Sequence, residues 1–503
     1  MNLRNASVLV VGAGIMGAGI VQVAALAGHR VKLYDTRPGA AADAKGKLAA
    51  TLDGLVNKGK LSAEAVQSAL QRIEPIAALT EAADAGLVVE AIVEQLEAKR
   101  SLFRELEGLL PADAVLATNT SSISVTAIAN GLQHPTRLVG MHFFNPVPLM
   151  KLVEVVSGLL TAPAVAEAIF DLAAHWGKVP VHAKSTPGFI VNRIARPYYA
   201  ETLALLLEQA AAPAVLDACL KAAGFRMGPC ELMDLIGHDT NFAVTKSVYE
   251  ANFYDKRYQP SLVQQEMVAG GLFGRKSGQG FYRHDGSAPA ALPVAVHEAP
   301  ATARQVTVHG RGPIADQLDK AAAAALAAQG WGPARQADSG WTGLEVDGAR
   351  LVLTDGRTAQ AMAAALGLFD VAVFDRPMQQ PALPGTALAY AVAPSASDAW
   401  RVQSAAWLAA LGFAPLPVAD APGLVVARTV AMLINEAADA VLQGVCSPEG
   451  ADAAMKLGVN YPAGPFEWLA RWSVDGVTGV IRALDDEYRG ERYRLSPWLR
   501  RAA

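Results

Sequence analysis

The sequence predicts an α/β domain of alternating strands and helices, then an all-helical domain, and then an altered second copy of the same plan. Short β-branched runs alternate with helical patterns over residues 1–184. Amphipathic helical patterns fill residues 185–285, and motifs of that region recur 235 positions later. We therefore divide the chain into five segments: 1–184, 185–285, a linker at 286–304, 305–418 and 419–503.

The composition is that of a multidomain globular chain. Its 503 residues give room for roughly three domains at about 150 residues each. The apolar excess is largely alanine, and no stretch is typical of a membrane span. The first residues run straight into a strand and lack the regions of a signal peptide. We therefore expect a cytoplasmic protein with no membrane partner.

Charge and cysteine content argue against two further classes. A net charge of −4 without a basic run argues against nucleic acid as the main partner. Cys219, Cys230 and Cys446 lie far apart, without metal-ligand spacing. The sequence therefore predicts no disulfide framework and no metal site, and buried thiols are the expected state.

A glycine-rich turn joins the first predicted strand, residues 7–11, to a helix. Gly12, Gly14 and Gly17 stand where such a turn lets a pyrophosphate approach the helix amino end. A second strand ends in Asp35, the position of a carboxylate that accepts from a ribose 2′-hydroxyl. This carboxylate favours NAD over NADP, although Arg37 nearby leaves that choice open. The pattern predicts a Rossmann-type NAD-binding domain.

Residues 39–80 have helical patterns broken at 57–60, with a new helix start at Ser62. This stretch is long for a simple crossover, so we expect a helical projection beside the cofactor. Lys58 and Lys60 could meet a substrate phosphate there, or could simply be solvated. The residues after the predicted strand 115–118, Asn119 to Ser122, could bond a ligand or cap the next helix.

Two apolar runs carry a histidine and a glutamate that could form an acid–base dyad. One run ends near His142, and the next carries Glu154 twelve positions later. A histidine can exchange a proton near neutral pH, and a carboxylate on its far nitrogen would fix the tautomer and stabilise the imidazolium. The alternative is a satisfied histidine at a strand end and a surface glutamate.

Seven motifs in order resemble the L-3-hydroxyacyl-CoA dehydrogenase family over residues 6–285. They are Gly12 to Gly19 with Asp35, Val89 to Glu94, Asn119 to Ser122, His142 to Pro146, Pro187 to Arg193, Met227 to Pro229, and Arg275 to Tyr282. The resemblance implies that His142 is the catalytic base and Glu154 its partner. It further implies that Ser121 and Asn192 contact the substrate.

The resemblance also implies cofactor and coenzyme A contacts. Besides the glycine turn, NAD would contact Asp35, Glu94, Lys99, Asn145 and Lys276, and Lys58 with Thr51 would lie near coenzyme A. The implied reaction is NAD-dependent oxidation of an (S)-3-hydroxyacyl-CoA to the 3-oxoacyl-CoA.

The acyl group is less constrained. The long form with a duplicated helical domain is similar to family members that act on 3-hydroxyadipyl-CoA in phenylacetate catabolism, and also to some that act on 3-hydroxybutyryl-CoA. A dicarboxylic acyl chain would need a cation near the pocket end, for which Arg193, Arg196 and Arg226 are candidates. Helix arginines are more often solvated or paired on the exterior.

The second half repeats the plan in reduced form. Pro422 to Arg428 repeats Pro187 to Arg193, and a G-x-G-x-x-A turn at 310–315 follows a short strand. The segment that we align with the His142 strand, 390–394, contains no histidine, and Ala427 replaces Asn192. We therefore expect a catalytically inactive, degenerate Rossmann-like segment with a structural role, in which the second helical domain packs on the first. A homo-oligomer and a second binding site in this half are the alternatives left open.

Two other classes of function remain open from the sequence. One is a non-catalytic NAD-binding protein that kept the fold. The other is a scaffold whose second half recruits a partner. The complete set of His142, Glu154, Ser121 and Asn192 argues against the first of these.

Overall fold

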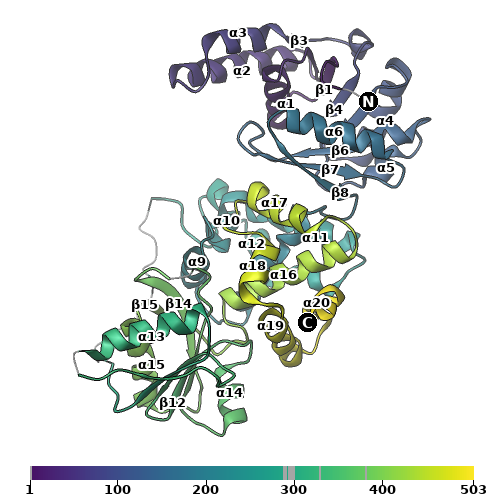
Figure 1. Cartoon of the computed structure of the whole chain (residues 1–503). Coiled ribbons are helices and arrows are strands. Elements are labelled where there is room, and N and C mark those ends of the chain that lie inside the picture. Colours follow the sequence, from purple (N-terminus) through teal and green to yellow (C-terminus); the bar gives the residue numbers. More distant parts are fainter. Residues whose placement is uncertain (1–2, 287–291, 293–300, 328–329, 380–381) are drawn as a thin grey trace. The chain divides into compact units, whose positions relative to one another are not determined.

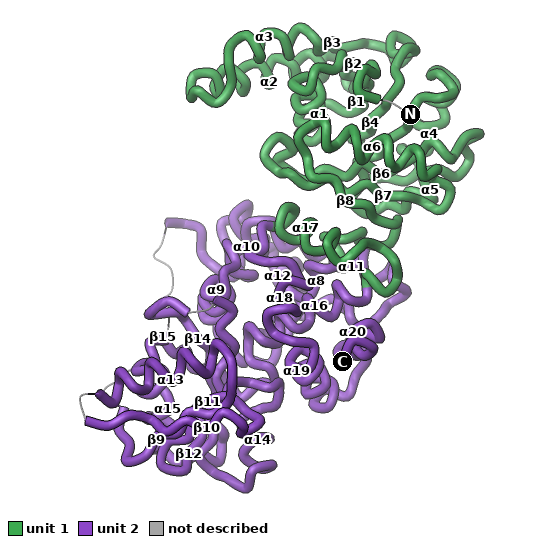
Figure 2. Tube along the Cα trace, in the orientation of Figure 1, with its two compact units in different colours: residues 1–193, 440–459 green, residues 194–439, 460–503 purple. Residues whose placement is uncertain are grey.

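The computed structural model describes residues 3–286, 292, 301–327, 330–379 and 382–503. The chain forms two compact units, and each combines segments that lie far apart in the sequence (Figures 1 and 2). Unit 1 comprises residues 1–193 and 440–459, and unit 2 comprises residues 194–439 and 460–503. The second half therefore contributes a segment to the unit that holds the N-terminal sheet.

Unit 1 is built on an eight-stranded sheet in the order β3-β2-β1-β4-β5-β6-β7-β8. All neighbouring strands are parallel except β6 and β7, which pair antiparallel. The predicted α/β fold is confirmed. The strands are β1 (Val8–Val11), β2 (Val31–Tyr34), β3 (Ile73–Pro75), β4 (Leu87–Glu90), β5 (Val115–Thr118), β6 (Leu138–Phe143), β7 (Leu152–Ser157) and β8 (Val179–Lys184).

Helices cover both faces of this sheet, as in other parallel α/β folds (Figure 1). Val8 and Val10 of β1 face one core, whereas the equally buried Leu9 between them points to the other face. The helices are α1 (Ile15–Leu26), α2 (Ala40–Asn57), α3 (Ala63–Gln71), α4 (Leu96–Leu109), α5 (Val125–Ala129), α6 (Pro163–His175) and the short α7 (Val191–Ile194), with 3-10 turns at Leu79–Ala82 and Pro135–Arg137.

The stretch from 39 to 80 is not wholly helical. The break at 57–60 and the start at Ser62 are confirmed, because the Ser62 side chain accepts from the backbone N–H of Ala65. However, Ile73 begins the edge strand β3, which pairs with β2. A three-residue edge strand leaves too short a pattern to be distinguished from the end of a helix.

Unit 2 contains the first helical copy and most of the second. The first is α8 (Arg196–Leu207), α9 (Pro213–Ala222), α10 (Pro229–Ile236), α11 (His238–Ala251) and α12 (Leu262–Ala269), with 3-10 turns at Lys256–Tyr258 and Arg275–Ser277. The second is most of α16 (Val426–Leu442), α18 (Pro465–Trp472), α19 (Val474–Tyr488), the turn η6 (Glu491–Tyr493) and α20 (Pro497–Ala502). The two copies pack on each other through buried ion pairs.

The second sheet has seven strands in the order β10-β9-β11-β12-β13-β14-β15. The expected degenerate copy is confirmed, although β10, β11 and β15 were missed because they are short or interrupted by proline and glycine. The elements are β9 (Val306–His309), α13 (Pro313–Leu326), β10 (Ala334–Gln336), β11 (Gly343–Val346), β12 (Ala349–Leu353), α14 (Ala359–Leu366), β13 (Val371–Phe374), β14 (Thr386–Val392), α15 (Asp398–Ala410) and β15 (Phe413–Pro417). Most of the linker at 286–304 lies outside the described residues.

Helix α17 (Pro448–Gly458) belongs to the second helical copy by sequence but packs on β7 and β8 in unit 1. The backbone N–H of Lys184 in β8 donates to the carbonyl of Val445, just before this helix. A Cβ atom on Gly458 would lie 2.7 Å from Leu152 in β7. The second half therefore supports the strand that carries Glu154.

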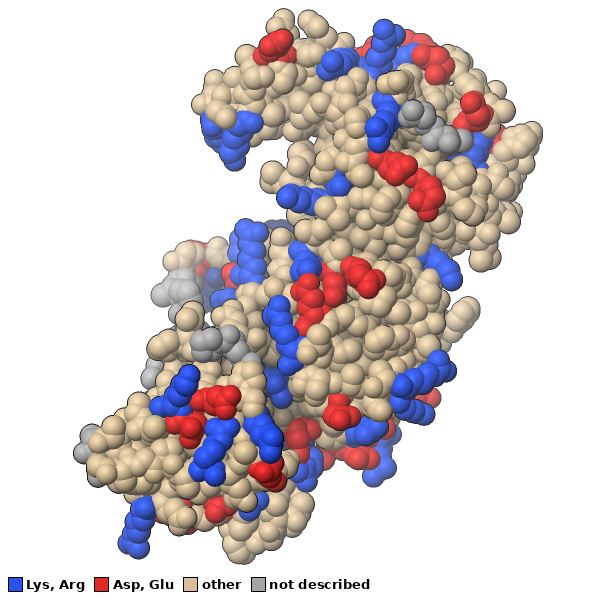
Figure 3. Space-filling model, viewed as in Figure 1, with Lys and Arg blue, Asp and Glu red and all other residues tan. Residues whose placement is uncertain are grey.

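No helix among the described residues is long and apolar enough to cross a membrane. On the face seen in Figure 3, basic and acidic side chains are interspersed over both units.

Candidate active site

His142 and Glu154 form a buried hydrogen-bonded pair. They are directly opposite each other in the antiparallel register of β6 and β7, so their side chains share one face of the sheet. Nδ1 of His142 lies 2.6 Å from Oε2 of Glu154, and the two residues are only 6% and 1% exposed. With Nδ1–H donated to the carboxylate, Nε2 is left as the nitrogen that can accept a proton.

The other carboxylate oxygen of Glu154 is also engaged. Oε1 accepts from the backbone N–H groups of Ile190 and Val191, at 3.1 and 2.9 Å. The rings of Phe144 and Phe189 lie beside the imidazole, with centroids 4.5 and 5.8 Å away. The glutamate is therefore buried and oriented rather than on the surface, which contradicts the alternative reading of this pair.

The glycine turn is closely packed at Gly12 and Gly17 and open at Gly14. A Cβ atom on Gly12 would lie 2.3 Å from the carbonyl oxygen of Ala91, and one on Gly17 would lie 1.7 Å from that of Gly12, so neither position admits a side chain. Gly14 has no atom within 4 Å of its Cβ position and begins α1 without a side-chain cap. The helix amino end is thus open to an anion.

Asp35 directly follows β2 and bonds to this turn. Its Oδ2 accepts from the backbone N–H of Ala13 at 2.8 Å, and its Oδ1 accepts from the backbone and side chain of Arg37. The hydrogen bond from the Arg37 side chain is the main cause that lowers the pKa of Asp35 to about 2. Arg37 is thereby paired with the carboxylate, and Asp35 stays ionised at neutral pH.

Glu94 links a buried lysine to the loop after β5. Lys99 lies between Glu90 and Glu94, at 2.6 and 3.2 Å. Glu94 accepts from the Thr120 hydroxyl and the Ser121 backbone N–H, at 2.6 and 2.9 Å. Burial raises the pKa of Glu94, but Lys99 and these hydrogen bonds outweigh it, so its pKa is lowered. An ionised carboxylate is therefore fixed beside Ser121.

Ser121 and Asn192 are brought together. The Asn192 amide donates to the Ser121 carbonyl oxygen at 3.4 Å, and Asn192 directly follows the N–H groups that hold Glu154. Asn145 is exposed just after the His142 strand and precedes a cis proline peptide bond. Six predicted residues, His142, Glu154, Ser121, Asn192, Glu94 and Lys99, thus belong to one hydrogen-bonded edge of the sheet in unit 1.

Three further predicted residues do not take part in these hydrogen bonds of unit 1. Lys58 and Thr51 are exposed on or just after α2, and the Thr51 hydroxyl is bonded to the Lys47 carbonyl of its own helix. Lys276 belongs to unit 2, where its ammonium pairs with Asp239.

Two supporting contacts were not predicted. Asn119, which we expected to bond a ligand or cap a helix, accepts from the backbone N–H of Phe143 at 2.8 Å and so ties β5 to the His142 strand. Lys178, which is 8% exposed, donates to the carbonyl oxygens of Val147 and Met150 in the loop after that strand. Burial lowers the pKa of Lys178 to about 8. No local pattern marks these contacts, because the partners are distant backbone groups.

The second sheet corrects our alignment of the second half with the first. The His142 strand β6 has a parallel neighbour β5 and an antiparallel neighbour β7, and β13 has the same neighbours in β12 and β14. The counterpart of the His142 strand is therefore β13 rather than residues 390–394. Its sequence Val-Ala-Val-Phe also lacks a histidine.

Asp375, directly after β13, repeats one function of Glu154. Its carboxylate accepts from the backbone N–H groups of Val425 and Val426, which stand 235 positions after Ile190 and Val191. Burial raises the pKa of Asp375 to about 6, against the effect of its backbone hydrogen bonds. The second half thus keeps a carboxylate that accepts from these N–H groups, but has no histidine in the strand before it.

No group of three or more His, Cys, Asp or Glu side chains among the described residues could hold a metal ion. All three cysteines are free, and Cys219 and Cys230 are buried.

Three family models match this chain. Residues 7–186 match the NAD binding domain of 3-hydroxyacyl-CoA dehydrogenases, and residues 188–284 and 423–503 both match the C-terminal domain of these enzymes. Residues 351–422 match the reduced Rossmann-fold domain of 3-hydroxybutyryl-CoA dehydrogenase.

The similarity to known proteins covers either the whole chain or about its first half. A 3-hydroxyadipyl-CoA dehydrogenase of Escherichia coli K12 is 43% identical over 100% of this chain and 98% of its own length. A crystal structure of a 3-hydroxybutyryl-CoA dehydrogenase from Escherichia coli K12 has a TM-score of 0.87 at 42% identity, covering 99% of this chain and 98% of its own. A probable 3-hydroxybutyryl-CoA dehydrogenase of Deinococcus radiodurans is 41% identical over 55% of this chain and 99% of its own length.

Proposed function

The chain belongs to the 3-hydroxyacyl-CoA dehydrogenase family and is an NAD-dependent enzyme of that class, and from this premise we propose that His142 and Glu154 carry the proton transfer of the reaction. The observation that supports this assignment is the 2.6 Å contact between His142 Nδ1 and Glu154 Oε2. The proposed reaction is oxidation of an (S)-3-hydroxyacyl-CoA to the 3-oxoacyl-CoA.

In this mechanism, Nε2 of His142 accepts the proton of the 3-hydroxyl group. The imidazolium that forms is stabilised by Glu154, whose charge lies against the opposite ring nitrogen. Bound NAD supplies the hydride acceptor for C3. The Ile190 and Val191 N–H groups keep Glu154 from turning away from the histidine. Phe144 and Phe189 limit the access of water to the ring.

The remaining roles follow the geometry of the sheet edge. We assign the pyrophosphate to the turn of Gly12, Gly14 and Gly17, because Gly14 leaves the start of α1 open. The further NAD contacts are Asp35 at the ribose, and Glu94, Lys99, Asn145 and Lys276. The substrate contacts are Ser121 and Asn192, whose main chain and side chain meet, with Lys58 and Thr51 near coenzyme A.

For the acyl group, we propose 3-hydroxyadipyl-CoA, formed in phenylacetate catabolism. The support is the name of the Escherichia coli relative, which matches over both full lengths. The alternative is 3-hydroxybutyryl-CoA, the substrate named for the matching crystal structure. Of the three candidate arginines, Arg193 bonds to Gln443, Arg196 is buried against Tyr199, and Arg226 is exposed.

The test is NAD reduction, followed by absorbance of NADH, with (S)-3-hydroxyadipyl-CoA and (S)-3-hydroxybutyryl-CoA side by side. We expect a higher kcat/KM for the dicarboxylic substrate. His142→Ala should lower kcat by about 10²–10⁴-fold, the usual contribution of general acid–base catalysis. His134→Ala, at an exposed histidine of the same domain, is the control. Full activity of His142→Ala would contradict the proposed role of this residue.

A further inference from the structure

Unit 2 contains a cavity of about 400 Å³ at one edge of the second sheet. Small-molecule sites are typically about 300–1,000 Å³, so this space is large enough for a small ligand. Its walls are the loops that follow β12 and β13, the turn before β11, helix α14, and the segment from Trp472 to Gly479. Because β12 and β13 are parallel, their carboxyl ends meet at the edge where α/β sheets usually bind ligands.

The cavity occupies the position in the second half that the catalytic edge occupies in the first. β12 and β13 are the counterparts of β5 and β6, since the order of parallel and antiparallel neighbours is the same. A proline follows at the third position after each of β6 and β13, at Pro146 and Pro377. Arg376 therefore stands where Asn145 stands in the first half.

Arg376 is a partly buried cation in this lining. Its guanidinium lies over the ring of Trp472, 4.5 Å from the centroid. Its Nε is buried without a hydrogen-bond partner, and the carboxylate whose charge acts on it is that of the preceding residue, Asp375. The neighbouring Asp375 turns to the backbone N–H groups of Val425 to Ala427. Burial lowers the pKa of Arg376 to about 10, so the side chain stays charged at neutral pH.

Two more arginines line the same cavity. Arg350 lies over the ring of Trp341, 5.0 Å from its centroid, and is 3.4 Å from Glu345. Arg357 pairs with Asp355 at 2.6 Å. The lining also includes Asp475, so the arginines of the lining outnumber its carboxylates three to two. The indole rings of Trp341 and Trp472 hold the guanidinium groups of Arg350 and Arg376 in place. The N–H groups of a stacked guanidinium can still donate to an oxyanion.

Helix α19 (Val474–Tyr488) borders the cavity at Gly479, where the missing side chain leaves space. A Cβ atom on Gly479 would meet only the carbonyl oxygen of Asp355, 4.0 Å away, so the position faces space. Glycine within a helix lowers stability relative to alanine. Apolar surface on another wall comes from Met362 and Leu366 of α14.

The geometry points to a second ligand site in this cavity, for a small organic acid anion whose carboxylate is gripped by Arg376 and whose apolar body contacts α14. The site lies outside the proposed catalytic residues and does not rest on the proposed reaction. A carboxylate fits the fork of a guanidinium, and the apolar wall favours an organic acid over an inorganic ion. The degenerate half would thus have exchanged catalysis for binding.

The test is calorimetric titration of the full-length chain with benzoate and hexanoate, beside benzamide and inorganic phosphate as a neutral isostere and a simple anion. At least one carboxylate should bind, with benzamide and phosphate at least about tenfold weaker. Arg376→Met, which keeps the contact with Trp472, should weaken binding by about ten- to a hundredfold, the usual contribution of a hydrogen bond to a charged group. Arg311→Gln, at an exposed arginine of the same sheet domain, is the charge control.

A second pair of variants tests the cavity without removing a charge. Gly479→Leu should fill the space and abolish binding, whereas Gly479→Ala should bind as the parent does. Both variants should reduce NAD as the parent does. Absence of carboxylate binding, phosphate binding as tight as benzoate, or unchanged binding in both Arg376→Met and Gly479→Leu would each overturn the proposal. If Arg376→Met fails to fold, the Gly479 pair decides alone.

Discussion

Glu154 combines two tasks in one carboxylate. One oxygen accepts from His142, and the other accepts from the N–H groups of Ile190 and Val191. One buried carboxylate therefore joins His142, its strand and the start of the helical region. A substitution that keeps the shape can separate the chemical task from the structural one.

Glu154→Gln is expected to lower kcat by about 10²–10⁴-fold while the fold is retained. The amide oxygen can still accept from Ile190 and Val191, but the amide N–H would donate to Nδ1 of His142 and leave the proton on Nε2. Steady-state kinetics and thermal unfolding measure the two effects. Asp171→Asn, which removes an exposed carboxylate of α6, is the control. Unchanged kcat would exclude an orienting role for Glu154.

The lowered pKa of Lys178 should make the stability of the fold depend on pH. Its pKa is lowered to about 8 by burial, whereas an unfolded lysine keeps its proton to about 10.4. Between these values the unfolded state binds more protons, so the contribution of Lys178 to the free energy of unfolding should rise with pH. The difference between the parent and Lys178→Met, measured by urea unfolding at pH 7 and pH 9.5, should therefore shift in favour of the parent. A constant difference would contradict the lowered pKa.

At the scale of elements, α17 connects the second half of the chain to the first. It comes from the second helical copy, yet it packs on β7, the strand of Glu154. In the reciprocal arrangement, α9 of the first helical copy packs on β14, the counterpart of β7. Each helical copy thus supports the sheet of the other half.

Gly458→Leu tests this support. The new side chain would begin 2.7 Å from Leu152 and 3.0 Å from Val191, so it should displace the strand or the helix at a cost of about 1–3 kcal/mol. We expect a lower melting temperature and a lower kcat, although the change lies outside residues 1–285. Gly108→Leu in α4, where no atom lies within 4 Å of the Cβ position, is the matched control. Equal kcat in both variants would show that α17 does not position the site.

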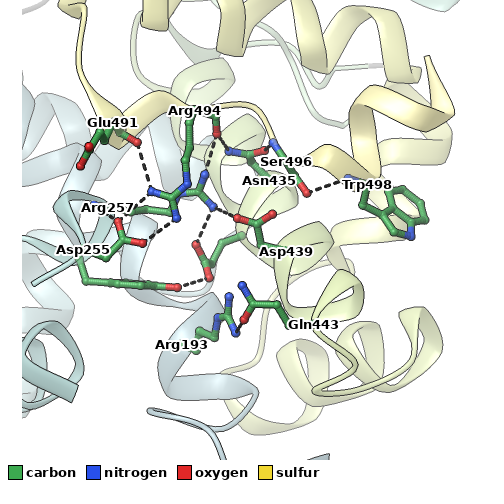
Figure 4. Close-up of polar contacts among 12 residues, drawn as sticks. Arg193, Asp255, Arg257, Asn435, Asp439, Gln443, Glu491, Arg494, Ser496 and Trp498 are labelled. Carbon is green, nitrogen blue, oxygen red and sulfur yellow. Dashed lines mark hydrogen bonds and ion pairs between the residues drawn. The ribbon is translucent and has the colours of Figure 1, made fainter. Parts of the chain in front are cut away.

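At the scale of the molecule, the helical copies are joined by two matching ionic clusters. Arg492 and Tyr493 contact Glu201 at 2.9 and 3.0 Å. The same pattern recurs at an offset of 235 positions, with Arg257, Tyr258 and Glu436 as the counterparts of Arg492, Tyr493 and Glu201. Arg257 and Tyr258 contact Glu436 at 3.3 and 2.6 Å. Figure 4 shows the second cluster, in which Arg257 also bonds to Asp439 and to the Arg494 carbonyl. The contact is therefore a two-fold interface folded into one chain.

Residues 1–285 expressed alone should consequently dimerise. Each copy would keep Glu201 together with Arg257 and Tyr258, which can pair with the equivalent residues of a second copy. Sedimentation velocity should show a dimer, and Arg257→Ala should shift it towards a monomer, because removing one partner of a buried ion pair leaves the other uncompensated. A folded, monomeric parent fragment would contradict this reading of the interface.

The sequence by itself determined the nucleotide-binding unit, the dyad and the repeat. Each is a local pattern: glycines between a strand and a helix, a histidine and a glutamate on adjacent apolar runs, and a motif that recurs at a fixed spacing. Even the neighbouring positions of His142 and Glu154 follow from the short connection between two antiparallel strands.

Only the tertiary structure decided how the halves serve each other. It showed that Asn119 bonds to the His142 strand and Lys178 to the loop after it, that the counterpart of this strand is β13, and that Arg376 lies over Trp472. Such pairs join residues 24 to about a hundred positions apart, through backbone carbonyls and ring faces that carry no sequence signal. The physical reason is that packing satisfies a buried charge or a buried N–H with whichever group the fold brings near it, and that group need have no pattern of its own.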